Sequence, residues 1–489
     1  MKQYVIGLDI GTTCTKCVLI DQTGKIAGQG SNGYTLYTDG DKVEQSAQDW
    51  IHAATVAIRE AIQGIDASYV KGISCSTQGG STVAVREDGT FIGNAWTWMD
   101  KRSTQQVREV DAQIGAEEVY RITGSRTSAA LDAAKIRKMK TLPEYKDASK
   151  YLTTLEVING WLTGNAVIDP SNAAMRQLFH IDTCTWDKQL MQAACVDIAE
   201  LPAIMPAGAF VGGLSYSASE ATGLPVGTPV FNGAHDQYCA SIGSGVIQAG
   251  EMLLSAGTTW VLLGITNTPM YTPSYIGPGR HPIDGLYGAL VSLVGSGTSM
   301  QWFHNNFMHV SFDVMNQEVT ARRDKTKGLF FFPYMTGAPY PIRNPDAKGA
   351  FLGLTLEHDA IDLARAVMEG VAFSVRRALE DFASYGADIK TITMMGGASK
   401  SEPWIQMIAS AANVNIRRLN TSDVCALGAA AIAACGVGFF SNYQEAANAM
   451  VSLDHVFEPD PEDQKWYHDK FAEYDRLWKL FEKYYKGES

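Results

Sequence analysis

Apolar stretches in this chain stop abruptly at short runs of small polar residues. Residues 4–10 are almost entirely apolar and predict a buried strand. Gly11, Thr12 and Thr13 predict a tight turn, and residues 14–20 predict the returning strand. The chain therefore begins with a β-hairpin whose turn carries no bulky side chain.

The same pattern returns in the middle of the chain. Residues 252–256 predict a strand, Gly257, Thr258 and Thr259 predict a turn, and residues 260–263 predict the second strand. The glycines that open the two turns are 246 residues apart (257 − 11), close to half of the 489 residues. We infer two domains of related architecture that meet near residue 245.

Helical periodicity fills much of the remaining sequence. Apolar residues fall on one face of residues 50–62 and again of residues 361–382. After Pro459, the pattern predicts one long helix from about residue 461. Its aromatic residues form a stripe that we expect to dock against the domains, with binding of a partner or oligomerisation, for instance as a homodimer, as the alternative. Since strands alternate with helices, the fold class is α/β.

Composition and charge exclude several classes of function. Hydrophobic residues make up 46% of the chain and charged residues 19%, as in an ordinary globular protein. The net charge of −12 repels nucleic acid and anionic lipid, so we expect neither as a partner. The apolar run at 427–440 is shorter than a membrane span. We expect a soluble, cytoplasmic protein.

The eight cysteines are too sparse for a disulfide framework. Cys14 and Cys17 form a C-x-x-C pattern, which elsewhere marks redox or zinc sites. Residues three apart on a strand point to opposite faces, so this pair is not expected to close or to bind a metal.

The two Gly-Thr-Thr turns are candidates for binding phosphate. A tight turn of small residues can direct several backbone N–H groups and threonine hydroxyls at one anion. Each turn alone could be an ordinary hairpin, but two of them, one per domain, would converge between the domains. Asp9 lies two residues before Gly11 and is a candidate anchor for Mg²⁺, usually through water in such sites.

Asp236 follows a short predicted strand and opens a helix of small residues. A carboxylate at a strand end can accept a proton from a substrate hydroxyl, although an isolated aspartate there often only caps the helix. We assign the neighbouring His235 and Gln237 to the substrate. An isolated histidine is otherwise more often structural.

A third group has the character of a sugar site. Indole rings face the C–H bonds of sugars, while amide, carboxylate and guanidinium groups bind the hydroxyls. The alternative is a surface loop with core tryptophans. The candidate residues are Gln78, Gly79, Trp98, Asp100 and Arg102.

A glycine-rich turn joins a strand at 389–395 to a helix that contains Trp404. Without side chains in the way, a flat base or a phosphate can approach such a turn closely, although many turns of this kind serve packing alone. The candidate residues are Gly396, Gly397 and Ser401.

Taken together, these motifs resemble those of the FGGY carbohydrate kinases, which belong with actin, hexokinase and the heat-shock ATPases. The order and spacing of six blocks carry the resemblance, which runs nearly end to end. The blocks are residues 8–13, 254–259, 332–337, 344–353, 364–372, and 395–404 with 426–431.

The resemblance implies two actin-like domains that hold ATP and a sugar in the cleft between them. Residues 1–245 would carry the sugar site and the first phosphate turn, and residues 246–489 the ATP site. It further implies Asp236 as the catalytic base, Asp9 near Mg²⁺, the two turns around the phosphates, and adenosine near Gly396, Gly397 and Ser401.

The expected activity is phosphoryl transfer from ATP to a small sugar. Residues 74–78 differ from the glycerol kinase pattern, and Thr77-Gln78-Gly79 differs from the usual xylulokinase pattern, so the sugar stays open. A ketopentose such as D-xylulose is our first choice. The alternatives are gluconate, ribulose, glycerol or erythritol, or an actin-like protein that binds ATP without catalysis.

Overall fold

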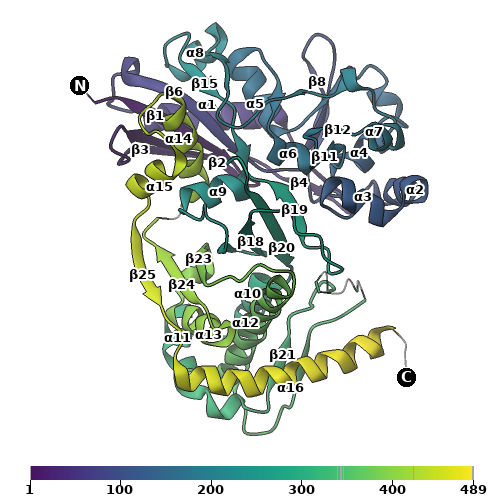
Figure 1. Ribbon diagram of the computed structural model, residues 1–489, viewed down its shortest axis with the longest axis vertical. Helices are drawn as coiled ribbons and strands as arrows, with labels where there is room; N and C mark the ends of the chain where they lie inside the picture. Colours follow the sequence, from purple (N-terminus) through teal and green to yellow (C-terminus); the bar gives the residue numbers. More distant parts are fainter. Residues whose placement is uncertain (1, 339, 342–343, 345, 422, 487–489) are drawn as a thin grey trace.

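The computed structural model describes residues 2–338, 340–341, 344, 346–421 and 423–486. It is built around two seven-stranded sheets, which we call the first and the second sheet (Figure 1). The first sheet has the order β14-β15-β6-β1-β2-β3, with β16 also paired to β6. Its strands are β1 (Tyr4–Ile10), β2 (Cys14–Asp21), β3 (Ile26–Gly33), β6 (Val70–Thr77), β14 (Phe210–Gly213), β15 (Pro229–Phe231) and β16 (Ala234–His235).

The second sheet has the order β19-β20-β18-β17-β23-β24-β25. Its strands are β17 (Glu251–Ala256), β18 (Trp260–Thr266), β19 (Gly277–Arg280), β20 (Tyr287–Leu293), β23 (Thr391–Met395), β24 (Asn415–Leu419) and β25 (Leu453–Phe457). In both sheets a hairpin lies beside a parallel strand: β1 pairs antiparallel with β2 and parallel with β6, while β17 does the same with β18 and β23. The repeated hairpins of the sequence therefore occupy equivalent places.

A five-stranded sheet, β4-β5-β8-β7-β9, borders the first sheet's side of the molecule. Its strands are β4 (Tyr37–Asp39), β5 (Lys42–Gln45), β7 (Thr82–Val85), β8 (Phe91–Trp96) and β9 (Lys150–Leu152). Three two-stranded ribbons complete the strands: β10 (Val167–Ile168) with β13 (Ala203–Ile204), β11 (Phe179–His180) with β12 (Thr185–Trp186), and β21 (Phe330–Phe332) with β22 (Ala350–Leu352).

Helices separate and cover the sheets. In the first half they are α1 (Ala47–Ala61), α2 (Thr104–Ile114), α3 (Ala116–Thr123), α4 (Asp132–Met139), α5 (Thr154–Thr163), α6 (Pro170–Ala174), α7 (Lys188–Ala193), α8 (Tyr216–Thr222) and α9 (Asp236–Gly243). In the second half they are α10 (Ser296–Phe307), α11 (Phe312–Val319), α12 (Ala360–Ser384), α13 (Glu402–Ala412), α14 (Val424–Gly436), α15 (Tyr443–Met450) and α16 (Pro461–Lys486).

Alternation along β1 explains how the layers form. Ile6 and Leu8 point to the side covered by α1, whereas Val5 points to the opposite side, where it packs with α14. Figure 1 shows α14 beside the purple N-terminal strands although it comes from the other end of the chain. A Cβ at Gly7 would lie 2.0 Å from the Ala426 carbonyl oxygen, so the glycine permits this close approach.

Helices α9 and α14 lie between the two sheets. Leu253 of β17 packs in one cluster with Tyr238 of α9 and Val424 of α14. The two helices themselves touch at glycines: a Cβ at Gly243 would lie 1.9 Å from the Val424 oxygen, and one at Gly428 would lie 1.8 Å from the Cys239 oxygen. This helix pair therefore fixes the first sheet relative to the second.

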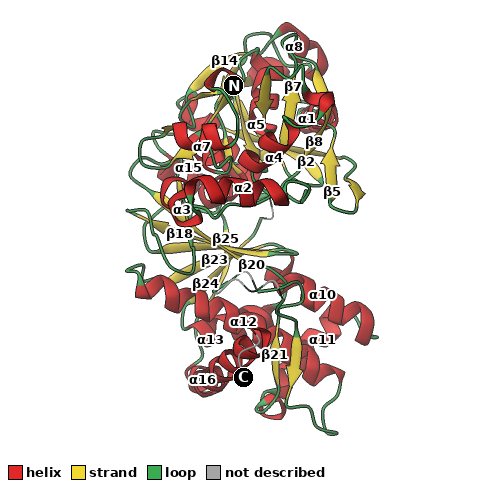
Figure 2. Cartoon of the chain, turned by 90° about the vertical axis from the view of Figure 1, so that its right-hand side faces the viewer, coloured by secondary structure: helices red, strands yellow, loops and turns green. Residues whose placement is uncertain are grey.

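The far side of the second sheet holds the largest core. Figure 2 shows helices α12 and α13 on this side of the sheet, and Figure 1 shows α16 running along beneath them. The aromatic stripe of α16 is buried in that core, which confirms the predicted docking face: Tyr467, Phe471, Tyr474 and Trp478. The α/β class agrees with the sequence analysis, and each half of the chain contributes one seven-stranded sheet. Pro345, part of the 344–353 block, lies outside the described residues.

Candidate active site

The first Gly-Thr-Thr turn joins β1 to β2, and its Gly11 and Thr12 are half-buried while Thr13 is exposed. All three of its carbonyl oxygens accept hydrogen bonds: Gly11 from the Tyr34 hydroxyl, Thr12 from the Gln45 amide, and Thr13 from the Tyr34 backbone N–H. Because these carbonyls are occupied and the Gly11 N–H donates to the Cys14 oxygen, the donors that the turn can still offer a ligand are the N–H groups and hydroxyls of Thr12 and Thr13. An anion such as phosphate suits such a turn.

The second turn joins β17 to β18, and its Gly257 and Thr258 are exposed. The Thr258 carbonyl accepts from the backbone N–H and the hydroxyl of Thr298, at 3.0 and 3.1 Å. A Cβ at Gly297 would lie 2.0 Å from the Gly257 oxygen. The N-terminal residues of α10 therefore contact the carbonyl groups of the second Gly-Thr-Thr turn. In the first Gly-Thr-Thr turn, the side chains of Tyr34 and Gln45 contact the carbonyl groups in the same way.

Two carboxylates lie close enough on the inner side of the first sheet for the charge of one to act on the other. Asp9 lies on the same face of β1 as Gly7 and accepts a 2.8 Å hydrogen bond from the Ser76 hydroxyl. Burial, and then the negative charge of Asp236, raise the pKa of Asp9 from 3.8 to about 7. Such a pair of acids favours a bound cation.

Asp236 is the first residue of α9, and its side chain is about one quarter exposed. Among the described residues, its Oδ1 has no hydrogen-bond partner. His235 Nδ1 lies 3.2 Å away, but this nitrogen accepts the backbone N–H of Gln237 and so has no proton for the carboxylate. His235, rather than Asp236, is thus the N-cap of α9, and Asp236 keeps an oxygen free to accept.

One hydrogen bond links the residue after Asp236 to the strand that leads into the second turn. The Ser255 hydroxyl donates to Gln237 Oε1 at 3.1 Å, and Ser255 stands two residues before Gly257. Gly396 approaches the same strand end, because a Cβ there would lie 2.7 Å from the Ala256 oxygen. The structure therefore brings both turns, both acids and the glycine-rich turn into one neighbourhood.

Gln78 lies buried behind the first turn. Its backbone N–H donates to Ile10, and its side-chain Nε2 donates to Gln45 Oε1 at 2.8 Å. Gln78 Oε1 has no partner among the described residues, so it can accept from a ligand hydroxyl. A Cβ at Gly79 would lie 2.6 Å from the His235 ring, which places this turn against the start of α9.

The two tryptophans of the predicted sugar loop differ in exposure. Trp96 is buried, whereas Trp98 is 42% exposed and donates from its indole N–H to the Thr12 hydroxyl at 3.2 Å. Asp100 is fully buried and pairs with Arg102 at 2.8 Å, while Arg102 lies over the Trp96 ring. Asp100 therefore holds Arg102 in place, and of these two side chains only that of Arg102 is partly exposed.

The glycine-rich turn follows β23. Gly396 has a φ of +95°, which favours glycine, and Gly397 has open space where a Cβ would be. The Ser401 hydroxyl donates to Asn316 Oδ1 of α11 at 2.7 Å. The turn is therefore open at its first residues and anchored at its end.

Sequence reasoning missed several polar residues of this neighbourhood. Gln45 joins the first turn to Gln78, and Lys16, which pairs with Asp9 across the hairpin, binds Asp423 at 2.8 Å. The alternation of β2 could have placed Lys16 beside Asp9. Nothing local in the sequence indicates Gln45, which reaches the turn from another sheet.

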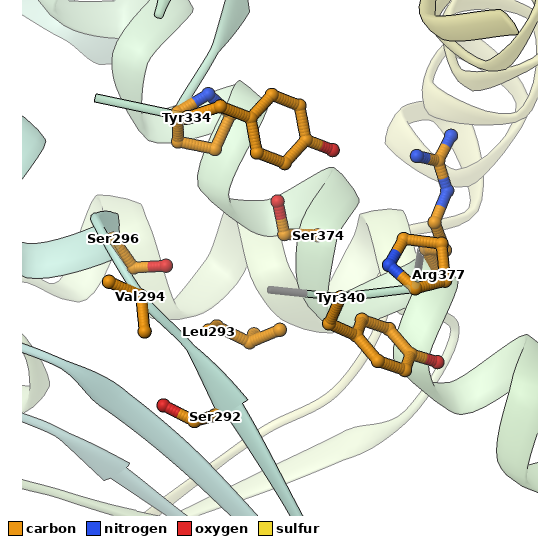
Figure 3. A pocket seen from close by; sticks show the side chains of 10 residues that line it. Ser292, Leu293, Val294, Ser296, Tyr334, Tyr340, Ser374 and Arg377 are labelled. Atoms are coloured by element: carbon orange, nitrogen blue, oxygen red, sulfur yellow. The ribbon is translucent and has the colours of Figure 1, made fainter. Parts of the chain in front are cut away.

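A small cavity of about 20 Å³ lies apart from these residues, behind the start of α10 (Figure 3). Ser296, Tyr340 and Arg377 are among its lining residues, and it has room for a single water molecule. The described residues contain no group of three His, Cys, Asp or Glu side chains arranged to hold a metal ion. None of the described helices is long and apolar enough to span a membrane.

Comparison with known proteins gives consistent matches. Residues 4–243 match the N-terminal domain, and residues 252–437 the C-terminal domain, of the FGGY family of carbohydrate kinases. The chain is 28% identical to a xylulose kinase of Staphylococcus epidermidis over 98% of its length and 97% of that protein.

Solved structures agree over nearly the whole chain. Ligand-bound xylulose kinase from Lactobacillus acidophilus matches with a TM-score of 0.91 and 27% identity, covering 99% of both chains. Gluconate kinase from the same species matches with a TM-score of 0.91 and 26% identity, covering 98% of both. The chain is therefore about equally similar to kinases of two different sugars.

Proposed function

The chain belongs to the FGGY family of carbohydrate kinases, and from this premise we propose that it phosphorylates a ketopentose such as D-xylulose. It is an ATP-dependent sugar kinase. Similarity to xylulose kinases supports the choice of sugar, and similarity to gluconate kinase makes gluconate the second candidate.

The single observation that carries the proposal is the free Oδ1 of Asp236, next to the link between Gln237 and Ser255. We assign Asp236 as the base that takes the proton of the attacking hydroxyl. The donors of the two Gly-Thr-Thr turns would stabilise charge on the transferred phosphoryl group. Gly396, Gly397 and Ser401 would line the adenosine.

Asp9 is the residue that we assign to Mg²⁺. Burial and the nearby charge of Asp236 raise the pKa of Asp9, and the charge of Lys16 opposes them only in part, which supports a bound cation here. When bound, Mg²⁺ supplies positive charge to the phosphates. Removal of divalent cations with EDTA should abolish turnover, and added Mg²⁺ should restore it.

For the sugar we assign Gln78, Gly79, Trp98, Arg102, His235 and Gln237, with Asp100 holding Arg102. The free Gln78 Oε1 and the exposed Trp98 ring support this assignment. We further propose a division near residue 245, because residues 1–245 and 246–489 each contribute one seven-stranded sheet. The cytoplasmic location and the homodimer stay predictions.

The test is ADP release by the purified protein with D-xylulose, D-ribulose, D-gluconate, glycerol and erythritol. We expect D-xylulose to give the highest kcat/KM. Asp236→Asn should bind ATP but lose about 10²–10⁴-fold in kcat, whereas Asp147→Asn, at an exposed position, should not. Near-normal turnover by Asp236→Asn would refute the assignment of the base.

A non-catalytic ATP-binding protein is the alternative from another class. It would bind ATP tightly and show no turnover that depends on any sugar. The same assay therefore decides between the two functions.

A further inference from the structure

A lysine ammonium is buried beneath the predicted sugar site. Lys135 of α4 has no exposed surface, and its Nζ donates to three backbone oxygens: Gly80, Ala130 at 2.8 Å and Trp96 at 3.3 Å. An ammonium has three donors, so all of them are used. No carboxylate pairs directly with Lys135 among the described residues.

The three carbonyls belong to segments that meet at the sugar site. Gly80 follows Gln78 by two residues, and Trp96 precedes Trp98 by two residues. A Cβ at Gly80 would lie 2.8 Å from the Ala130 oxygen and 3.3 Å from the Trp98 Cβ, so these segments are already in contact. The Lys135 ammonium thus connects the turn that follows Gln78 to the loop that carries Trp98.

Stability alone does not account for this lysine. Burying an ammonium costs several kcal/mol, and apolar residues of similar volume often serve a core as well or better. Burial lowers the pKa of Lys135 to about 8, with Asp132, Asp100 and Arg102 as the charged groups that act on it. The ammonium form, with its three donors, still dominates at neutral pH.

We propose that Lys135 is a positioning residue for the sugar: its ammonium sets the spacing between the Gln78 turn and the Trp98 loop. This inference rests on the proposed function, since it takes those two segments as the sugar site. The ligand is a polyhydroxylated small molecule that contacts the Gln78 amide and the Trp98 ring together. ATP, which we assign to the other turns, is linked to these segments through the Trp98 hydrogen bond to the Thr12 hydroxyl, so the KM for ATP should change much less than the KM for the sugar.

The test compares Lys135→Met with Lys470→Met. Lys470 is also buried and donates to a backbone oxygen, that of Thr326, but it pairs in addition with the buried Glu369 and lies on α16 in the core of the second sheet. Both variants lose a buried ammonium, so both should lower the thermal midpoint. Only Lys135→Met should raise the KM for the sugar, by about tenfold, with the KM for ATP unchanged within twofold.

An unchanged sugar KM in folded Lys135→Met, or an equal rise in Lys470→Met, would overturn the inference. If Lys135→Met does not fold, Lys135→Arg answers the same question. It keeps the charge, but its planar head cannot meet three carbonyls at one point, so sugar KM should rise and ATP KM should not. An unchanged sugar KM would then count against the proposal. If the wild type turns over no sugar, the proposed function itself fails.

Discussion

The contact between α9 and α14 leads to a prediction that connects packing with catalysis. In Gly428→Ala the new Cβ would lie 1.8 Å from the Cys239 carbonyl oxygen, and side-chain Cβ atoms essentially never come closer than 3.0 Å to such an atom. The two helices must therefore separate by at least 1.2 Å (3.0 − 1.8). Overpacking of this kind costs about 1–3 kcal/mol of stability.

The displacement should reach the active site because α9 begins with Asp236. A misplacement of about 1 Å can cost on the order of 10²-fold in rate. We therefore expect Gly428→Ala to lower both the thermal midpoint and kcat, the latter by about 10²-fold, with a smaller effect on the KM for ATP.

Thermal unfolding and steady-state kinetics on the same preparation would measure both effects. The matched control is Gly328→Ala, because a Cβ there meets only open space. It should behave as the wild type. A Gly428→Ala variant with wild-type kcat and thermal midpoint would show that the helix contact does not control the position of the acid.

Three further predictions concern single side chains. Trp98→Ala should raise the KM for the sugar by about tenfold and leave the thermal midpoint almost unchanged, since the exposed ring mainly serves the ligand; an unchanged KM would remove Trp98 from the sugar site. Gly396→Ala places a side chain at φ +95° and 2.7 Å from the Ala256 oxygen, so stability should fall by about 1–3 kcal/mol and the KM for ATP should rise, while a normal KM would separate this turn from the nucleotide. Burial lowers the pKa of His281 from 6.5 to about 3, and its Nδ1 accepts the Ile283 N–H, so the folded state binds fewer protons than the unfolded state between these values. Stability should therefore fall by about 2 kcal/mol from this group between pH 7 and pH 5, as measured by urea unfolding, and a His281→Gln variant with an equally steep loss would contradict the assignment.

The parts of the fold that follow from local pattern were predictable. The mostly apolar run before Gly11 and the similar run before Gly257 led to two hairpins, and both occur with the expected turns. The aromatic spacing after Pro461 led to a long docked helix, and α16 is that helix. In each case the pattern that predicts the element lies within the residues of that element.

The parts that depend on distant residues were not predictable. Gln45 and Lys135 hold the candidate site from β5 and α4, yet each looks like an ordinary polar residue in its own segment. Asp100 was expected to face the sugar, but its buried carboxylate is engaged by Arg102. Residue type alone does not distinguish a side chain that contacts the ligand from one that only holds such a side chain in place. The difference depends on whether neighbouring residues already form hydrogen bonds or ion pairs with its polar atoms.

The packing of α14 on β1 has a consequence for the synthesis of the chain on the ribosome. Ala426, which meets Gly7, is added 419 residues later (426 − 7). At typical rates of synthesis, the N-terminal strand waits about 20–80 s on the ribosome before its covering helix exists. Until then one apolar face of the newly made hairpin is exposed. Nascent-chain chaperones should therefore bind the chain more during this interval than at any later stage of translation.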